Sequence, residues 1–334
     1  MRVLVFDGPH RFHIEDRSLP EPGSGEVRIR VARVGICGSD LHGYTGESGR
    51  RHPGMVMGHE ASGWLEALGP DVGGLRIGEL VTFNPELPCD GSCGHTAPNR
   101  CSRLRVIGVT PDIQGAFADA IVVPADRIVG AGGLTVDRAA AAEPMAVAIQ
   151  ASRRAEVGVG DDVVVLGGGM IGQCVAQAAR VAGATSITVS DPLPERRQIA
   201  AHAGFEVIHP AQVEERAPFD RAIDAVGVSA TAAASIKAVR VGGTICFVGL
   251  GRPEVSIPLF DVVVAERMIA GSFGYSDGVF REAVTRLGEG SLDLGPLIGS
   301  VVDFEDAPQV FEDLARDARR DVKILVSTGA DPPA

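Results

Sequence analysis

The sequence of 334 residues has few aromatic residues and fewer basic than acidic ones. One tryptophan, two tyrosines and twelve phenylalanines leave little aromatic material for a narrow apolar pocket. Lysine and arginine together number 31 against 43 aspartates and glutamates, so the formal net charge is −12. Because binding to phosphate groups requires a basic face, this charge argues against nucleic acids and anionic membranes as partners.

Long apolar runs are also missing. No uninterrupted apolar stretch is long enough to cross a bilayer, and the first residues, Met1 to Phe6, are typical of a strand rather than of a signal peptide. We therefore expect a cytoplasmic protein without a membrane partner. At this length the chain should divide into about two domains.

The six cysteines are unevenly distributed. Two of them lie in apolar runs and are expected to be small core residues. A third, Cys37, stands in a polar loop, and the other three form a cluster of Cys89, Cys93 and Cys101. In a cytosolic chain, such a cluster indicates a metal more often than a disulfide.

Two kinds of pattern divide the chain. Up to about residue 130 it consists of short apolar strands separated by glycine and proline, which is typical of a compact β-barrel or sandwich. From about Asp137 onward, apolar strands alternate with helices, as in a doubly wound parallel sheet of the α/β class. The C-terminal segment is mixed. We expect it to complete the first domain, with the α/β domain inserted in the middle of the chain.

A glycine-rich turn follows the apolar strand Val163 to Leu166. Gly167, Gly169 and Gly172 have the G-x-G-x-x-G spacing, and a helix over 170–182, beginning with Met170 and Ile171, follows them. Glycines allow a tight turn and close approach of the backbone, so that the helix N-terminus faces a pyrophosphate. The turn therefore predicts a dinucleotide-binding site.

An acidic residue at the end of the next strand favours NAD as the dinucleotide. Asp191 lies about twenty residues beyond the glycine turn, where an acid that binds the adenosine ribose is expected. Its carboxylate would repel a 2′-phosphate. Arg196 and Arg197 leave NADP open as an alternative, since a nearby arginine can accommodate that phosphate.

Two short segments offer metal ligands. Cys37 supplies a thiolate, and the consecutive His59 and Glu60 supply an imidazole and a carboxylate. This is the mixed ligand set of a zinc site that keeps one position for substrate. Taken singly, Cys37 and His59 could equally be a buried free cysteine and a core histidine. A Lewis-acid metal and a nicotinamide in one chain indicate hydride transfer to or from a carbon that bears oxygen.

In the order and separation of these motifs, the chain resembles the zinc-dependent alcohol dehydrogenases of the medium-chain dehydrogenase/reductase superfamily. Glu143, in the sequence Glu143-Pro-Met-Ala146, makes it similar to the polyol (sorbitol-type) and threonine dehydrogenase branch. The resemblance implies a GroES-like catalytic domain over residues 1–145 and 274–334 and a Rossmann NAD-binding domain over 146–273. It also implies a homodimer or homotetramer joined through an edge of the nucleotide domain.

The resemblance further implies the roles of the metal-site residues. Cys37 and His59 would be permanent ligands of a catalytic zinc. Glu60 would be a third ligand or a close carboxylate that exchanges with water, and Glu143 would take the place of a second cysteine. Asp40 would accept the spare N–H of His59 and so fix its tautomer.

The proton path and one cofactor contact are implied in the same way. Ser39 and His42 would carry the proton of the substrate alcohol to bulk water. Lys323 would contact the cofactor pyrophosphate, with an exposed lysine at a strand edge as the alternative.

The cysteine cluster lies where relatives often carry a structural zinc bound by four cysteines, but its spacing departs from theirs. A set of Cys89, Cys93, His95 and Cys101 is chemically suitable, because three cysteines and a histidine form a known tetrahedral zinc site. The alternative is a loop that has lost its metal.

The polar segment 43–51, between the two metal segments, bears on the substrate. We expect a secondary alcohol that carries further hydroxyl groups, such as a polyol or sugar, with Tyr44, Glu47, Arg50 or Arg51 as contacts. A segment this polar can also simply face solvent. Two other functions remain to be weighed: a zinc-free, NADPH-dependent quinone or enone reductase of the same superfamily, and a non-catalytic NAD-binding protein.

Overall fold

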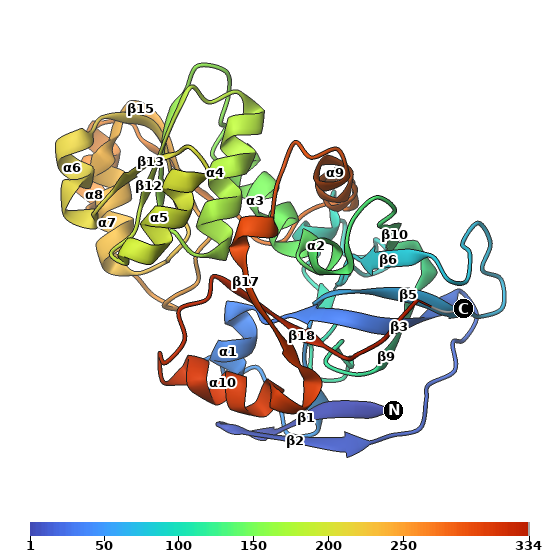
Figure 1. The fold of residues 1–334 in the computed structure, drawn as a ribbon. Coiled ribbons are helices and arrows are strands. Elements are labelled where there is room, and N and C mark those ends of the chain that lie inside the picture. The colour runs from blue at the N-terminus through green and yellow to red at the C-terminus, as the bar shows by residue number, and fades with distance from the viewer. Residues whose placement is uncertain (333–334) are drawn as a thin grey trace. The chain divides into compact units, whose positions relative to one another are not determined.

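The computed structural model describes residues 1–332. The chain forms two compact units (Figure 1). The first unit comprises Met1–Glu143, Ser276–Glu289 and Ile298–Ala334, and the second comprises Pro144–Tyr275 and Gly290–Leu297. Within the described residues, no helix is both long enough and apolar enough to span a membrane.

The first unit is built on three β-sheets. The largest has the order β10-β6-β5-β3-β18-β17, with β9 also paired to β3. A three-stranded sheet has the order β2-β1-β4, and β7 pairs with β8. Its strands are β1 (Arg2–Gly8), β2 (Arg11–Asp16), β3 (Glu26–Gly35), β4 (Met55–Val56), β5 (Glu60–Leu68), β6 (Leu80–Phe83), β7 (Glu86–Leu87), β8 (Arg105–Val106), β9 (Ala120–Pro124), β10 (Ile128–Gly130), β17 (Ile298–Asp303) and β18 (Lys323–Ser327).

Strand β3 is the centre of the large sheet because it pairs with three other strands. Along it, the buried residues Val27, Ile29 and Val31 alternate with arginines, the period-2 pattern of a strand with one face in the core. These residues belong to a single apolar cluster that also includes residues from β1, β5, β6 and β18. The long β3 is therefore held firmly in the sheet, and the residues that follow its C-terminal end have a fixed position.

Helices of the first unit lie at the ends of these strands. They are α1 (Gly38–Tyr44), α2 (Val136–Ala140), the start of α3 (Ala142–Arg154), α9 (Asp277–Gly288) and α10 (Ala307–Ala315), with the short 3₁₀ helices η1 (Pro98–Arg100), η2 (Ala125–Arg127) and η5 (Phe304–Asp306). α1 lies beside α10 (Figure 1). The Tyr44 ring stacks on Phe12 at 5.0 Å and lies 5.5 Å from Phe311, so aromatic contacts join α1, β2 and α10.

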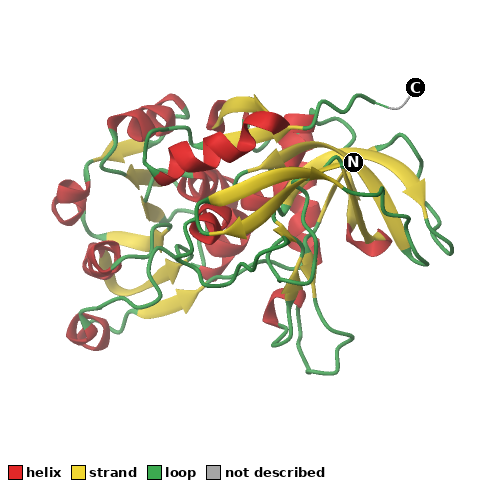
Figure 2. Cartoon of the chain, turned by 90° about the horizontal axis from the view of Figure 1, so that it is seen from below, coloured by secondary structure: helices red, strands yellow, loops and turns green. Residues whose placement is uncertain are grey.

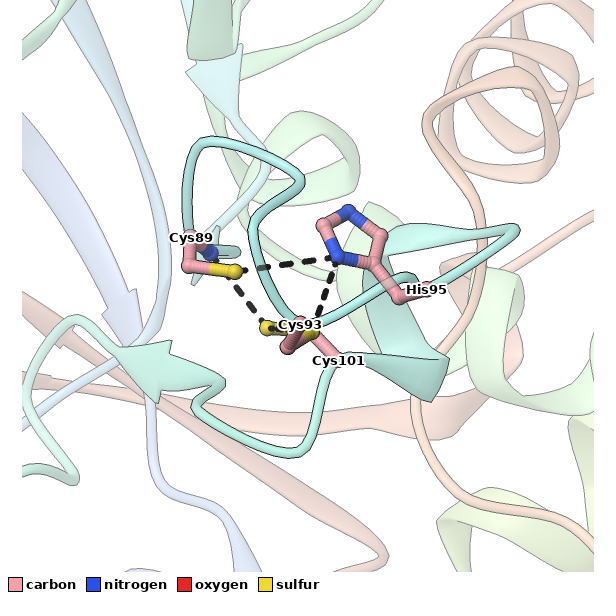
Figure 3. Close-up of side chains that lie close together, drawn as sticks. All are labelled: Cys89, Cys93, His95 and Cys101. Carbon is pink, nitrogen blue, oxygen red and sulfur yellow. Dashed lines mark hydrogen bonds between the residues drawn. The ribbon is translucent and has the colours of Figure 1, made fainter.

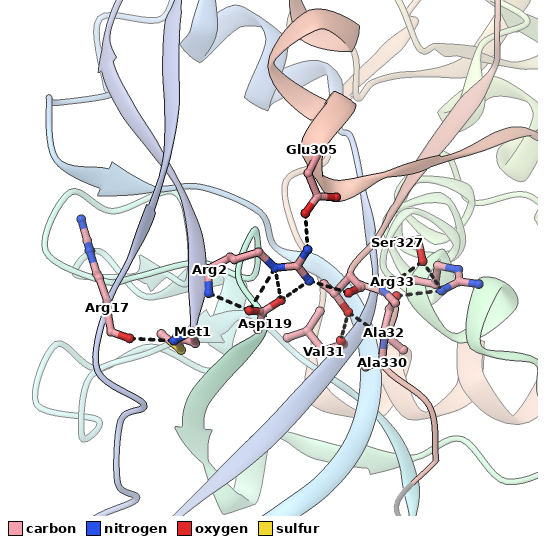
Figure 4. Close-up of polar contacts among 12 residues, drawn as sticks. Met1, Arg2, Arg17, Val31, Ala32, Arg33, Asp119, Glu305, Ser327 and Ala330 are labelled. Atoms are coloured by element: carbon pink, nitrogen blue, oxygen red, sulfur yellow. Dashed lines mark hydrogen bonds and ion pairs between the residues drawn. The ribbon is translucent and has the colours of Figure 1, made fainter.

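The two ends of the chain are tied together within the first unit (Figure 4). The Arg2 guanidinium donates hydrogen bonds to Asp119 Oδ1 at 2.7 Å and to the Thr328 carbonyl at 2.7 Å, and it also pairs with Glu305. Arg33 on β3 donates to Ser327 Oγ at 2.9 Å. These bonds connect β1, β3 and the end of β18, so the C-terminal strand is an integral part of the N-terminal unit.

The second unit is a six-stranded sheet with the order β13-β12-β11-β14-β15-β16. Every neighbouring pair of strands is parallel. Numbered from the first strand of the unit, this is the 3-2-1-4-5-6 order of a Rossmann fold, and the order reverses between β11 and β14. The strands are β11 (Asp162–Leu166), β12 (Ser186–Ser190), β13 (Glu206–Ile208), β14 (Phe219–Asp224), β15 (Val239–Phe247) and β16 (Met268–Gly271).

Helices lie on both sides of this sheet (Figure 2). They are α4 (Met170–Ala182), α5 (Pro194–His202), α6 (Val213–Arg216), α7 (Ser229–Ala238) and α8 (Leu259–Val264), with most of α3 and the 3₁₀ helices η3 (Pro210–Gln212) and η4 (Gly295–Leu297). The predicted fold class, a β-rich GroES-like part with a doubly wound parallel sheet, is confirmed.

One segment lies elsewhere than the sequence suggested. Residues 274–334 were all expected in the first domain, but Gly290–Leu297 belongs to the second unit. The reason is a pair of bonds with α4. Gln177 Nε2 donates to the Asp293 carbonyl at 2.7 Å, and the Asp293 N–H donates to Gln177 Oε1 at 2.7 Å.

Candidate active site

Antiparallel pairing of β3 with β5 brings three candidate metal ligands together in the first unit. Gly35, the last residue of β3, is opposite Glu60, the first residue of β5. Cys37 therefore comes beside His59, and the ligand atoms of Cys37, His59 and Glu60 all lie within 4.8 Å of one another. A side chain at Gly35 would collide with the Glu60 carboxylate, which explains the glycine at that position.

The turn before His59 also requires glycine. Gly58 has φ 98°, in the left-handed region that residues with a Cβ rarely adopt. A Cβ there would lie 2.9 Å from the ring of Phe117. The sequence Gly58-His59-Glu60 is thus a tight turn that delivers two consecutive ligand residues at the start of a strand.

The donor set fits zinc. A thiolate, an imidazole and a carboxylate are all ordinary zinc ligands, and three protein ligands are typical of sites that also bind substrate. Glu143 lies near the start of α3, half-buried and outside the cluster of three, but it belongs to the same unit. It is close enough to act electrostatically on Lys323 in this cluster.

Lys323 is buried against the metal ligands. Its ammonium group donates to Glu60 Oε2 at 2.6 Å and to the Ile36 carbonyl at 3.0 Å, and its side chain is only 3% exposed. Burial opposes its charge, but Glu60, Cys37 and Glu143 outweigh burial and raise the pKa of the ammonium. The expectation of an exposed lysine at a strand edge is therefore wrong, since β18 is an inner strand. The ammonium is bonded to Glu60 instead of being free for a pyrophosphate.

Asp40 lies next to His59, as the resemblance implied. Its carboxylate is completely buried, and one oxygen accepts the Cys37 N–H at 3.2 Å. The other oxygen is 3.5 Å from His59 Nδ1, and neither of these two atoms has a hydrogen-bond partner among the described residues. Burial opposes the charge of Asp40, but His59 and the Arg51 guanidinium keep the pKa of the carboxyl below its ordinary value.

Ser39 and His42 both lie on α1. They are three residues apart, so their side chains share one face of the helix. Ser39 is exposed and His42 is half-buried.

Two of the four suggested substrate contacts have buried side chains instead. Tyr44 is buried and donates its hydroxyl proton to Glu312 Oε2 at 2.9 Å. The Arg51 side chain is 2% exposed and packs beneath α1. Glu47 and Arg50 are exposed. Polarity of the segment did not distinguish the buried from the exposed residues, because both kinds are charged or hydroxylated.

The cysteine cluster also comes together (Figure 3). Cys93 Sγ lies 3.2 Å from His95 Nδ1, and Cys89 Sγ lies 3.8 Å from the same nitrogen. The sulfurs of Cys93 and Cys101 are 3.6 Å apart, much farther than a disulfide bond. All four ligand atoms lie within 4.8 Å of one another. The hydrogen bond with His95 lowers the pKa of the Cys93 thiol to about 5, so a thiolate, the form that binds zinc, is present at neutral pH.

The glycine turn in the second unit follows the Rossmann pattern. Gly167, directly after β11, has φ 99°. Gly169 is the N-cap of α4, whose first residues are Met170 and Ile171. A side chain at Gly172 would collide with the Gly167 carbonyl, so this glycine lets the helix approach the turn. The backbone N–H groups in the first turn of such a helix can donate hydrogen bonds to a pyrophosphate.

Asp191, at the end of β12, is bonded to the same turn. Its Oδ2 accepts the Gly168 N–H at 2.7 Å, and its Oδ1 accepts the Leu193 N–H at 2.8 Å. Arg196 Nη1 lies 3.7 Å from Asp191 Oδ2. Arg197 donates to the Asp191 carbonyl at 2.6 Å, so its guanidinium is held by the backbone. Arg196 is thus the arginine whose guanidinium lies beside the Asp191 carboxylate.

A β-rich unit with a Cys, His and Glu cluster and a Rossmann unit with a glycine turn define a class of protein: oxidoreductases that use zinc and a nicotinamide cofactor. Comparison with known proteins agrees. The family model for the alcohol dehydrogenase GroES-like domain matches residues 23–132, and that for zinc-binding dehydrogenases matches residues 170–289.

The chain is similar over nearly its whole length to individual members. It is 32% identical to D-xylulose reductase A of Aspergillus niger, covering 97% of this chain and 96% of that protein. The structure of 2R,3R-butanediol dehydrogenase from Bacillus subtilis superposes with a TM-score of 0.88 at 27% identity, covering 98% and 99% of the two chains. A zinc-binding dehydrogenase of Sinorhizobium meliloti, solved with NADP, gives 0.91 at 29% identity and covers 98% of each.

The chain therefore belongs to the zinc-dependent alcohol and polyol dehydrogenases of the medium-chain dehydrogenase/reductase superfamily. It is an oxidoreductase that uses zinc and a nicotinamide cofactor and acts on a small alcohol. The predicted family and enzyme class are confirmed, and the two rival functions are not favoured. The sequence had not indicated that the side chains of Arg51 and Lys323 are buried beside the candidate ligands. Gly43, which leaves room for Arg51, and Gly35, which leaves room for Glu60, were the available signals.

Proposed function

We propose that this enzyme interconverts a polyol, sugar alcohol or similar polyhydroxylated secondary alcohol with its ketone, using NAD(H). The observation that carries the proposal is the cluster of Cys37, His59 and Glu60 within 4.8 Å in a chain that matches a D-xylulose reductase over 97% of its length. Glu143 in place of a cysteine ligand gives a harder metal environment, which supports the polyol branch.

Residues of the first unit have separate roles in the proposed reaction, in metal binding and in proton transfer. Cys37, His59 and Glu60 of the cluster hold the zinc, and Glu143, near the start of α3, is a further carboxylate ligand for it. A zinc ion held there supplies Lewis-acid polarisation of the substrate oxygen. Ser39 accepts the hydroxyl proton, and the His42 imidazole passes it to water.

NAD is the proposed cofactor, held at Gly167, Gly169, Met170, Ile171 and Gly172. Asp191 supports this choice, because a buried carboxylate that is fixed by two backbone N–H groups would repel a 2′-phosphate. Arg196 argues for the alternative, as does the NADP in the Sinorhizobium meliloti relative. The two cofactors can be separated by comparing kcat/KM.

We further propose that Cys89, Cys93, His95 and Cys101 bind a structural zinc. The convergence of four ligand atoms in one loop supports a closed tetrahedral site, in contrast to the three-ligand cluster. Such a site would hold the loop between β7 and β8, which has little regular structure of its own.

A homodimer formed through the β16 edge of the second unit is proposed as the assembly. In the described structure β16 is the last strand of its sheet, and large apolar side chains around it are exposed. They include Val241, Leu250, Leu259, Phe260, Val263, Val264, Met268 and Phe273. A free strand edge can pair with its own copy across a two-fold axis.

A substrate screen tests the catalytic proposal. Zinc-replete enzyme is assayed by NADH absorbance with sorbitol, xylitol, inositol, 2,3-butanediol, threonine and simple secondary alcohols. We expect the highest kcat/KM for a substrate with at least two hydroxyl groups. Preference for an unfunctionalised aliphatic alcohol would reject the polyol assignment. Full zinc occupancy without turnover of any alcohol would revive the non-catalytic alternative.

A further inference from the structure

Arg51 is a buried cation beside the proposed catalytic zinc site, with no part in the functions described above. Its side chain is 2% exposed, and its Nη2 lies 3.8 Å from Asp40 Oδ1. Arginine is rarely buried without a partner of opposite charge. In the described structure, the carboxylate that it faces is the same one that lies 3.5 Å from His59 Nδ1.

The guanidinium is fixed by atoms from three separate segments. Its Nη1 donates to the Val109 carbonyl at 3.2 Å, its Nη2 points to the Ser39 carbonyl at 3.5 Å, and its Nε contacts the sulfur of Met57 at 3.1 Å. A Cβ at Gly43 would lie 2.6 Å from Arg51 Cγ. Gly43 in α1 thus leaves room for the aliphatic part of the Arg51 side chain. The planar guanidinium group contacts several partners at once, which the single ammonium group of a lysine could not do.

Asp40 needs such a partner to keep its position. Its side chain is completely buried, and Oδ2 accepts a hydrogen bond from the Cys37 N–H, whereas Oδ1 has no hydrogen-bond partner among the described residues. The remaining oxygen, Oδ1, lies 3.5 Å from His59 Nδ1 and 3.8 Å from Arg51 Nη2. A carboxylate beside a ligating histidine fixes the ring orientation and leaves the other ring nitrogen for the metal.

We propose that Arg51 is a positioning residue for the zinc ligand His59, acting through Asp40. It holds the carboxylate where it can accept the Nδ1–H of His59, so that Nε2 is the nitrogen presented to zinc. This inference rests on the proposed catalytic zinc site. It extends that site by one layer, to a residue that touches neither substrate nor metal.

If Arg51 acted only through its charge, its removal would have the opposite effect on zinc binding. Removing a cation near a divalent metal ion would strengthen zinc binding by Coulomb's law. Removing a positioning residue would weaken it, because the histidine is no longer held. Changes to groups that orient metal ligands typically cost about 10- to 100-fold in metal affinity.

The test compares Arg51→Met, Arg51→Lys and the matched control Arg50→Met, which makes the same change at the exposed neighbouring residue. Zinc release into a large excess of a chromogenic chelator is followed for the intact protein. The phase that belongs to this centre is the one absent from Cys37→Ser. Thermal unfolding is measured with and without zinc, and the spectrum of the cobalt-substituted protein reports ligand geometry.

We expect Arg51→Met to weaken zinc binding at this centre about 10- to 100-fold and to change the cobalt spectrum. Arg51→Lys should lose less zinc affinity than Arg51→Met, and Arg50→Met should match the wild type in zinc binding and in the cobalt spectrum. Combining Arg51→Met with Asp40→Asn should cost no more than Asp40→Asn alone, since both act on the same contact.

Equal or tighter zinc binding in folded Arg51→Met would overturn the inference. So would equal losses of melting temperature with and without zinc, because these indicate a purely structural role. If Arg51→Met does not fold, Arg51→Lys decides, and zinc retention equal to wild type in that variant would also overturn it. A wild-type protein that binds no zinc through Cys37 would instead refute the proposed function.

Discussion

Glu60 and Lys323 form a buried ion pair at the centre of the first unit, with 2.6 Å between Glu60 Oε2 and the Lys323 Nζ. Their side chains are 1% and 3% exposed, and they are 263 residues apart in sequence. The pair joins the first residue of β5 to the first residue of β18. One oxygen of a candidate metal ligand is thereby committed to a lysine.

Replacing Lys323 with methionine should strongly destabilise the protein. The change leaves the Glu60 carboxylate buried without its partner, and breaking a buried pair in this way costs about 3–5 kcal/mol. The measurement is the free energy of unfolding in urea. The control is Lys237→Met, which removes an exposed pair with Glu214 and should have no measurable effect. Adding Glu60→Gln to Lys323→Met should recover part of the loss; no recovery would contradict the explanation.

Counting zinc separates the two metal sites. One ion at each proposed site would give wild-type enzyme about two zinc ions per chain. Cys37→Ser should lose one ion together with activity, whereas Cys93→Ser should lose the other and mainly lower thermal stability. Atomic emission on dialysed protein gives the number. Two ions retained in Cys93→Ser would remove the basis for the structural zinc.

Chelation provides an independent check of the catalytic ion. Treatment with a strong chelator should abolish alcohol oxidation, and added zinc should restore it. Activity that survives complete removal of zinc would mean that Cys37 and His59 serve another purpose.

Asp191 should control the choice of dinucleotide. In Asp191→Ser the carboxylate is replaced by a neutral hydroxyl, so we expect kcat/KM for NAD to fall by about 10-fold or more and the preference over NADP to narrow. Arg196→Ala should affect NADP more than NAD, because the guanidinium lies beside the ribose-binding acid. Steady-state kinetics with both cofactors gives the ratio of kcat/KM for NAD to kcat/KM for NADP. A wild-type preference for NADP would show that Arg196 dominates over Asp191.

A charge on the apolar face of α8 should weaken the proposed dimer. Val264 is 65% exposed, and Val264→Lys would place an ammonium group in the contact. Val159→Lys is the matched control, because Val159 is 91% exposed and lies outside the residues of the proposed interface. Light scattering during size-exclusion chromatography gives the mass. A wild-type monomer, or a Val264→Lys protein that is still fully dimeric, would reject this interface.

Stability in acid should depend on Glu66. Partial burial opposes its charge, but the Arg28 and Arg30 guanidinium groups lower the pKa of the Glu66 carboxyl in the folded state. A depressed folded pKa adds stability above the unfolded pKa, and that stability is lost as the pH falls through the folded pKa. Glu66→Gln should therefore be less stable than wild type at neutral pH, and the difference should vanish in acid. Urea titrations at several pH values test this; a difference that is constant with pH would contradict it.

Local patterns predicted the parts of the molecule that local chemistry determines. The Gly58-His59-Glu60 turn and the Gly167 to Gly172 turn are contiguous motifs, so each can be recognised from neighbouring residues alone. The alternation of strands and helices after Asp137 was sufficient for the parallel sheet, because each strand is followed by its own helix.

Contacts made across the sheets could not be predicted in the same way. Lys323 reaches Glu60 only because β18 pairs with β3, and no pattern near either residue specifies that pairing. From the sequence, Arg51 was expected to be a polar loop residue. The burial of its side chain beneath α1 depends on Gly43 and on the Val109 carbonyl, neither of which adjoins it in sequence. Tyr44 was misjudged for a similar reason, because its partner Glu312 lies on a helix near the other end of the chain.

The position of β18 has a consequence for how the enzyme matures. During synthesis the ribosome releases Cys37, His59 and Glu60 long before Lys323, and β18 must then insert between β3 and β17. The Rossmann unit, encoded in between, can fold as it emerges, since domains generally fold as units. The ion pair of Glu60 with Lys323 is therefore among the last contacts of the first unit to form, whereas the pairing of β3 with β5 that brings Cys37, His59 and Glu60 together needs only the first part of the chain.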